Sequence, residues 1–240
     1  MSSMAALAWD EEGAICMGGN SVSGTNSTRY SRPILRNLVL GILAILAILH
    51  GSAAAATTTI LAFGDSLFAG YGLPPEDGLS VQLEAALKKA GHDIRIVNAG
   101  VSGDTTAAGL SRLGWSLADK PDLVLLELGA NDALRGLDPL KARDNLDRML
   151  EKLRGQKFPV LLIGMMAPRN LGSDYVAKFD SMYGALAKKY DVPLYPFLLD
   201  GVALNPALNQ ADGIHPNAAG VKIIVERLLP AVETALPKTN

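Results

Sequence analysis

The chain has 240 residues, of which 49% are hydrophobic and 19% are charged, and this is enough for one globular core of ordinary size. Its 22 basic and 24 acidic residues give a formal net charge of -2, so no basic surplus favours a nucleic-acid partner. The single cysteine excludes an intrachain disulfide and a thiolate metal cluster.

Residues 1–56 differ in composition from the rest of the chain and have the features of an export signal. Three arginines precede the apolar run 38–49, and four consecutive alanines follow it closely. A basic flank, an apolar core and a small-residue cleavage site are typical of a signal peptide, whereas a spanning helix needs about 20 apolar residues. We expect a leader over 1–56, a mature domain over 57–240, and a protein that is exported to the periplasm or secreted and is not inserted in the membrane. An N-terminal anchor that is not cleaved is the alternative.

The mature chain alternates short apolar runs with amphipathic segments. The expected strands are 59–63, 94–97, 123–128, 160–163 and 192–195. The expected helices are 79–90, 105–113, 140–153, 176–190 and a last helix that starts at Pro216 and ends near Leu236. Strands that alternate with helices indicate a parallel sheet covered on both faces. The predicted fold class is α/β, as a three-layer α/β/α flavodoxin-like sandwich with about five parallel strands in one domain.

Polar loops follow the first three predicted strands. These loops contain Gly64-Asp65-Ser66, Gly103-Asp104 and Gly129-Ala130-Asn131-Asp132. Because open α/β sheets bind ligands at the carboxyl ends of their strands, we expect the three loops to meet at one edge. A fourth loop, which contains Asp212-Gly213-Ile214-His215-Pro216 and precedes the last helix, can reach the same edge.

A serine nucleophile needs a base to take its proton and a third group to orient that base. Ser66 is the candidate nucleophile, because it follows the end of the first strand. Of the three histidines, His50 lies in the leader and His92 at a helix end, so His215 is the candidate base. Asp212 lies three residues before His215 and can orient its ring.

Acyl transfer also needs hydrogen-bond donors directed at the developing oxyanion. The backbone N–H groups of Ser66 and Gly103 and the side-chain amide of Asn131 are the candidates for this oxyanion hole. Each candidate has a simpler interpretation as a turn or cap residue when it is taken alone. The combination is more informative, because four unrelated turns would have to converge by accident.

Three aspartates in these loops, Asp65, Asp104 and Asp132, have a structural interpretation as hydrogen-bond acceptors that brace their own loops. The sequence has no phosphate-binding G-x-x-x-x-G-K-[ST] loop and no G-x-G-x-x-G fingerprint. Phe68 occupies the position where a G-x-S-x-G elbow requires glycine. One histidine with scattered carboxylates is too few ligands for a metal site, so neither a metal nor a cofactor is expected.

The four loops together resemble the blocks of the SGNH (GDSL-type) hydrolase family. Gly64-Asp65-Ser66-Leu67 looks like the first block and Gly103 the second; Gly129-Ala130-Asn131-Asp132 and Asp212-Gly213-Ile214-His215 look like the third and fourth. The resemblance covers the whole mature chain and is strongest to the branch of periplasmic acyl-CoA thioesterase I, lysophospholipase and arylesterase. It implies a serine hydrolase that cleaves acyl esters and thioesters through an acyl-enzyme on Ser66.

The resemblance also implies where a substrate binds. The segment 165–175 lies where that branch has a mobile acyl-chain loop, so Met165, Met166, Pro168 and Leu171 are the expected substrate-binding residues. The expected partner is a small acyl ester, thioester or lysophospholipid, and the expected oligomeric state is a monomer.

Two alternatives stay open at this point. One is a deacetylase of cell-envelope carbohydrates from the same family, which would prefer acetyl groups. The other is a binding module for lipid or carbohydrate that has no catalytic activity. A binding module has no need of Ser66, Asp212 and His215 together, and the chain contains all three.

Overall fold

A single parallel sheet of five strands runs through the computed structural model, which describes residues 57–237. The predicted leader over 1–56 lies outside the described residues. The strands are β1 (Thr58–Gly64), β2 (Ile94–Gly100), β3 (Leu123–Glu127), β4 (Val160–Ile163) and β5 (Leu194–Tyr195). Their order in the sheet is β2-β1-β3-β4-β5, and every neighbouring pair is parallel.

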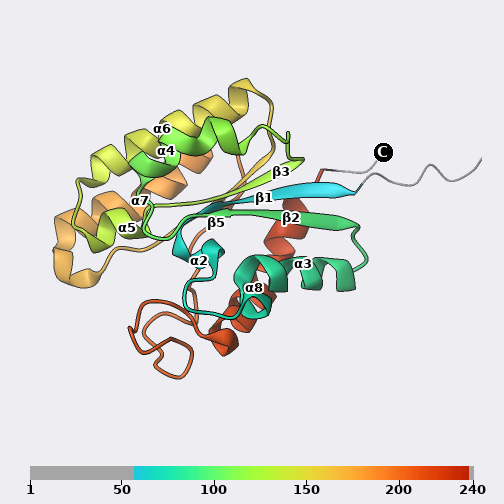
Figure 1. Cartoon of the computed structure of the whole chain (residues 1–240). Coiled ribbons are helices and arrows are strands. Elements are labelled where there is room, and N and C mark those ends of the chain that lie inside the picture. The colour runs from blue at the N-terminus through green and yellow to red at the C-terminus, as the bar shows by residue number, and fades with distance from the viewer. Residues whose placement is uncertain (1–56, 238–240) are drawn as a thin grey trace, which may run out of the picture. The chain divides into compact units, whose positions relative to one another are not determined.

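Helices cover both faces of this sheet. They are α2 (Ser66–Ala69), α3 (Leu79–Lys89), α4 (Thr106–Ser116), α5 (Ala130–Leu134), α6 (Pro139–Gly155), α7 (Ser173–Tyr190) and α8 (Ala218–Ala235), with 3₁₀ turns η1 (Pro75–Asp77) and η2 (Arg169–Leu171). Figure 1 shows α4, α6 and α7 together on one side of the sheet and α3 with α8 on the other. The predicted three-layer α/β/α sandwich with five parallel strands is therefore confirmed.

The central strands are buried on both faces because helices pack on each side of them. Every residue of β3 and of β4 is buried, and the five residues from Ile60 to Gly64 in β1 are buried as well. These are the near-continuous apolar runs that a covered parallel sheet requires. The sequence pattern predicted strands here for this reason.

The long helices begin and end at residues that favour helix ends. The Asp138 carboxylate caps α6 by accepting a hydrogen bond from the Leu140 N–H at 2.9 Å, and Pro139 is the first helical residue. The buried face of α6 then repeats at helical spacing, through Leu146, Met149, Leu150 and Leu153. Its predicted extent of 140–153 agrees with the structure to within two residues.

Several predicted boundaries are wrong. The second strand ends at Gly100 instead of 97, the second predicted helix ends at Ser116 instead of 113, and α7 begins at Ser173 instead of 176. The fifth strand was expected over 192–195, but β5 has only two residues, because the Val192 N–H bonds to the Ala187 carbonyl and so closes the end of α7. The last helix was expected to begin at Pro216. In the structure the Asn217 side chain caps α8 instead, and Pro216 forms an isolated antiparallel bridge with Asn209.

Two short helices replace segments that were expected to be loops. Helices α2 and α5 directly follow β1 and the Gly129 turn, and each has only four or five residues. A hydrophobic period cannot be recognised over so short a stretch. Among residues 57–237, no helix is both long and apolar enough to cross a membrane.

The backbone of Gly100, at the end of β2, lies against the turn that follows β1. A Cβ atom on Gly100 would lie 2.3 Å from the Ala69 nitrogen and 2.8 Å from the Asp65 carbonyl oxygen. Both are main-chain atoms, so a side chain cannot be accommodated without moving the turn. Gly184, on the exposed side of α7, has no such neighbour within 4 Å.

We expect Gly100→Ala to lower the free energy of unfolding by about 1–3 kcal/mol through overpacking. Gly184→Ala is the matched control, and it should raise the same quantity by up to about 1 kcal/mol because alanine is the better helix former. Urea denaturation of the two variants measures both values. Equal midpoints for Gly100→Ala and the unmodified protein would contradict the close approach.

Candidate active site

Ser66 lies at the junction between β1 and α2. The Asp65 side chain accepts a hydrogen bond from the Leu67 N–H at 3.0 Å and so caps α2 at its start. Ser66 is then the first helical residue, and only 9% of it is exposed. Ser66 therefore lies at the carboxyl edge of the sheet, directly after the end of β1.

His215 reaches Ser66 from the loop before α8, 149 residues further along the chain. Its Nε2 lies 2.9 Å from the Ser66 Oγ, and its Nδ1 lies 2.6 Å from an oxygen of Asp212. The other Asp212 oxygen accepts hydrogen bonds from the backbone N–H groups of Ile214 and His215. One carboxylate therefore orients both the loop and the imidazole ring.

These contacts also determine the charge of Asp212. The His215 backbone N–H, the His215 ring and the Ile214 N–H together lower the pKa of Asp212 to about 2. Asp212 consequently stays ionised throughout the neutral range. An ionised carboxylate on Nδ1 leaves Nε2 free to accept the proton of Ser66.

The loop that joins β5 to α8 and contains Asp212 and His215 is named the histidine loop. Further contacts tie it to the segment after α2. The Gln210 side chain donates to the Tyr71 carbonyl at 2.8 Å and to the Pro216 carbonyl at 3.0 Å. The Tyr71 ring lies against the His215 ring, with 4.6 Å between centroids. Neither Tyr71 nor Gln210 was a predicted site residue, because nothing in the local sequence connects them to His215.

The predicted oxyanion donors come from the adjacent loops. Asn131 is in the first turn of α5, and its side-chain nitrogen donates to an Asp65 carboxylate oxygen at 3.1 Å and to the Asp104 carbonyl at 3.0 Å. The loop that carries Gly103 thus meets the loop that carries Asn131. Gly103 has a φ of +85°, which favours glycine, and its carbonyl accepts a hydrogen bond from Arg135 at 2.8 Å.

The three loop aspartates are hydrogen-bond acceptors, as predicted. Asp65 accepts from Leu67 and Asn131, and Asp104 accepts from Arg112. Asp132 is 3% exposed and accepts from both the backbone N–H and the hydroxyl of one residue, Thr106, at 2.8 and 2.7 Å. Asp132 therefore holds α5 to the start of α4.

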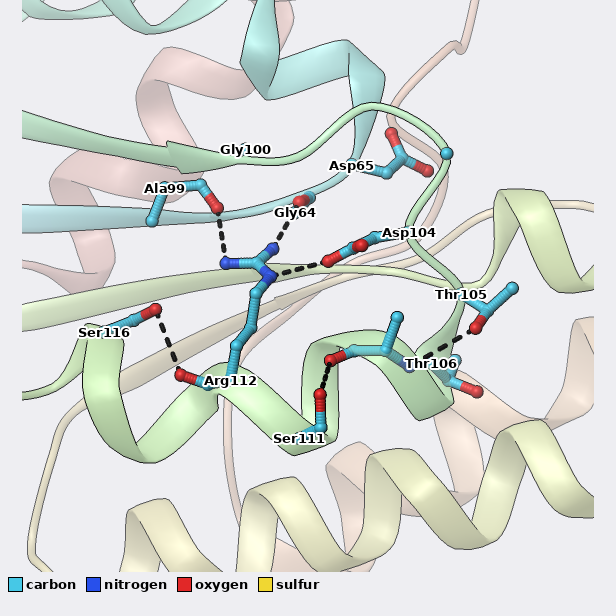
Figure 2. A network of polar contacts seen from close by, with 12 residues as sticks. Gly64, Asp65, Ala99, Gly100, Asp104, Thr105, Thr106, Ser111, Arg112 and Ser116 are labelled. Atoms are coloured by element: carbon cyan, nitrogen blue, oxygen red, sulfur yellow. Dashed lines mark hydrogen bonds and ion pairs between the residues drawn. The ribbon is translucent and has the colours of Figure 1, made fainter.

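Arg112 of α4 joins the ends of two strands and one loop. Its guanidinium donates to the Ala99 and Gly64 carbonyls at 2.8 and 2.9 Å and to the Asp104 carboxylate at 2.6 Å (Figure 2). It also lies 4.1 Å from the centre of the Phe63 ring. Sequence reasoning missed Arg112; the available signal was a charged residue beside the buried Leu113 on a helix that faces the sheet.

The expected substrate-binding segment lies at the end of β4. Met165 is buried within the hydrophobic core, Met166 is 45% exposed, and Pro168 and Leu171 are half-buried. Among the described residues, the polar side-chain contacts of this segment include the Ala167 N–H and the Arg169 guanidinium on Asp180 of α7, and none involves Ser66 or His215. A role for these residues in binding substrate stays a prediction.

Exposed apolar side chains also flank the polar loops, and the sequence analysis did not single them out. Leu134 follows Asn131 by one helical turn, and Ile214 precedes His215. The exposed large apolar residues in the segments around the four loops are Tyr71, Val101, Leu134, Leu137, Leu140 and Ile214. Among residues 57–237, no group of three or more His, Cys, Asp or Glu residues is placed to hold a metal ion.

A serine hydroxyl contacts a histidine, and that histidine contacts an aspartate, at the carboxyl edge of a parallel sheet. This arrangement defines a serine hydrolase. Residues 62–223 match the model of the GDSL-like Lipase/Acylhydrolase family. The chain therefore belongs to this family, and the resemblance to SGNH hydrolases is confirmed.

Curated relatives and solved structures agree with the family. The chain is 43% identical to "Esterase TesA" of Pseudomonas aeruginosa, over 76% of this chain and 91% of the relative. It is 41% identical to "Thioesterase 1/protease 1/lysophospholipase L1" of Escherichia coli K12, over 68% of this chain and 78% of the relative. The crystal structure of AlinE4, an SGNH-hydrolase family esterase, is 52% identical, with a TM-score of 0.65 over 78% of this chain and 100% of that one.

Arg112 offers a test of how the strand ends are held. We expect Arg112→Met to lower the free energy of unfolding by about 2–3 kcal/mol, because it leaves the Asp104 carboxylate and two carbonyls without their charged donor. Arg143→Met, on the exposed side of α6, is the matched control and should change stability by no more than about 0.5 kcal/mol. Thermal and urea unfolding measure both, and equal losses in the two variants would contradict the assigned role of Arg112.

Proposed function

We propose that this chain hydrolyses acyl esters and thioesters with Ser66 as the nucleophile, His215 as the general base and acid, and Asp212 as the residue that orients His215. The observation that carries the proposal is the pair of contacts, 2.9 Å from Ser66 to His215 and 2.6 Å from His215 to Asp212. Both lie within the range that proton transfer and ring orientation require. The chain is an SGNH serine esterase/thioesterase by family and by its relatives.

The chemistry proceeds in two halves. In the first, the His215 Nε2 takes the Ser66 proton while the Oγ attacks the acyl carbonyl carbon, and the resulting imidazolium then protonates the departing alcohol or thiol. This leaves an ester on Ser66 and a neutral imidazole. In the second half, His215 activates a water molecule, which releases the acid and restores the Ser66 hydroxyl.

Each half passes through a tetrahedral intermediate with a negatively charged oxygen. The proposed donors to this oxygen are the backbone N–H groups of Ser66 and Gly103 and the side-chain amide of Asn131. Both contacts of the Asn131 amide nitrogen are currently with protein oxygens, on Asp65 and Asp104. An oxyanion would therefore share or displace one of these acceptors as it forms.

The apolar residues around the polar loops support an acyl substrate. Leu134, Leu137 and Leu140 are each between 42% and 55% exposed in the segment that follows Asn131. An acyl chain that left the carbonyl position could cover such surface, since burial contributes about 0.8 kcal/mol per methylene group. A deacetylase of envelope carbohydrates would gain nothing from it, so we favour esters, thioesters and lysophospholipids with longer chains.

A Ser66→Ala variant tests the nucleophile. We expect a fall in kcat of at least about 10³-fold on p-nitrophenyl esters, because no acyl-enzyme can form. The unmodified domain, begun at Thr57, is assayed beside it from acetyl to palmitoyl esters, and the highest kcat/KM is expected above acetyl. Equal turnover by both proteins would refute the assignment of Ser66, and a sole preference for acetyl would favour the deacetylase.

The pH dependence of kcat/KM for the unmodified domain tests His215 as the general base. The kcat/KM should fall toward acid pH, because a protonated imidazole cannot accept the Ser66 proton. Asp212, with a pKa of about 2, remains ionised and adds no further step above pH 4, whereas protonation of Asp65, whose pKa burial raises to about 6, adds to the fall. A flat profile from pH 5 to 8 would speak against His215 as the base.

We further propose that the enzyme is exported, to the periplasm or the medium, and acts there as a monomer on small acyl substrates. The support is the basic flank, the apolar run 38–49 and the alanines of the leader. Native mass spectrometry of the exported protein should find a single chain that begins at Ala56 or Thr57. A full-length chain in the membrane fraction would instead indicate an uncleaved anchor.

A further inference from the structure

A second carboxyl group lies behind the active site, and the mechanism above does not use it. Glu127 is the last residue of β3 and is fully buried. One of its oxygens accepts a hydrogen bond from the Asp65 backbone N–H at 3.2 Å, and the other has no hydrogen-bond partner among the described residues. A buried carboxylate with so little compensation is strongly unfavourable, so the group is expected to be neutral.

Asp65 links Glu127 to the proposed oxyanion site. Asp65 is 1% exposed and directly precedes Ser66. Its carboxylate accepts from the Asn131 amide at 3.1 Å, and its backbone N–H donates to Glu127 at 3.2 Å. Two buried carboxyl groups on residues in contact favour a state with one proton on the pair, because two buried negative charges would repel each other.

The proton belongs to Glu127. Burial, and after it the charge of Asp65, hold the pKa of Glu127 well above its usual range. Burial also raises the pKa of Asp65, but only to about 6, because the Leu67 N–H, the charge of His215 and the Glu127 carboxyl act in the opposite direction. Burial and the charge of Asp65 therefore favour a pair in which Glu127 holds the proton and Asp65 carries the negative charge.

We propose that Glu127 is a positioning residue of this hydrolase: as a neutral acid it donates a hydrogen bond to Asp65, and Asp65 thereby holds the Asn131 amide in place for the oxyanion. This inference rests on the proposed function, since it assigns a purpose to the Asn131 amide. Neutrality also matters electrostatically, because a second carboxylate beside Asp65 would oppose the negative charge that develops near Ser66.

The other titratable groups around this pair are consistent with a single negative charge. On α7, the Tyr183 hydroxyl donates to the Leu128 carbonyl at 2.9 Å, and burial, followed by the nearby carboxylates, raises its pKa well above the usual range. Asp132 on α5 is held by Thr106 of α4. Arg112, also of α4, bonds to Gly64, Ala99 and Asp104 and to neither member of the pair.

Two substitutions distinguish a role of Glu127 as a neutral hydrogen-bond donor from a role in which its side chain only fills space. Glu127→Gln keeps the volume and a neutral donor, so its kcat on p-nitrophenyl esters at pH 7.5 should stay within about threefold of the unmodified enzyme. Glu127→Leu removes the donor and should lower kcat by about 10–100-fold with KM nearly unchanged, as expected for a misplaced transition-state contact. Leu153→Ala, in α6, is the control: the cavity it leaves should lower the urea midpoint of unfolding, while kcat stays unaltered.

Two spectroscopic measurements do not depend on turnover. The infrared C=O band of a protonated carboxylic acid should be present at pH 7.5 in the unmodified protein and missing in Glu127→Gln. The side-chain amide resonance of Asn131 should move in Glu127→Leu and stay in place in Glu127→Gln. If the unmodified protein hydrolysed no ester, the proposed function would fail, and these two signals would still decide the role of Glu127.

Three results would overturn the inference. A folded Glu127→Leu variant with unchanged kcat and an unmoved Asn131 resonance would make Glu127 a filler of space. A Glu127→Gln variant as impaired as Glu127→Leu would mean that a charge is required. The absence of the infrared band from the unmodified protein would mean that Glu127 is ionised. If Glu127→Leu does not fold, Glu127→Gln and the infrared band still test the inference.

Discussion

The close contact between the turn after β1 and the end of β2 is the constraint on which the rest of the site depends. Gly100 allows its backbone to lie against the backbone of Asp65 and Ala69, where a Cβ would overlap main-chain atoms. Because this contact is between backbones, it leaves little freedom in the direction of Ser66. The histidine loop, in turn, brings its imidazole to 2.9 Å from the Ser66 hydroxyl.

Electrostatics impose a second constraint, since the carboxyl groups of Asp65, Asp104 and Glu127 lie in the loops and strand end around the proposed oxyanion donors, where their charge would oppose the oxyanion. The structure manages this charge locally. Arg112 compensates Asp104, Glu127 is held neutral by burial, and Asp212 shares its charge with the imidazole and two backbone N–H groups. The remaining charge, on Asp65, faces the Asn131 amide. Burial of Asp65 and Glu127 makes the contacts of these two carboxyl groups stronger than they would be in water.

The histidine loop shows how distant segments share a site. It is long and has little regular structure, yet Gln210 ties it to the Tyr71 carbonyl, and Asn217 caps α8 immediately after it. These contacts place His215 relative to Ser66 without a strand or helix between them. Loops held in this way carry functional residues on a rigid scaffold, which is the general arrangement in α/β enzymes.

The sequence by itself determined the α/β class, the alternation of strands and helices, and Ser66, His215 and Asp212 as candidates, because buried strands and long amphipathic helices have periods that can be read locally and polar loops at strand ends stand out. It did not determine the two-residue length of β5, the start of α8 at Ala218, or the helical turn at Ser66. Those features, and the partnership of Asp65 with Glu127 and of Arg112 with two strand ends, depend on hydrogen bonds between residues far apart in the chain. Only the tertiary structure decides such contacts, because the sequence around a carboxyl group or a guanidinium does not indicate which distant group it will contact.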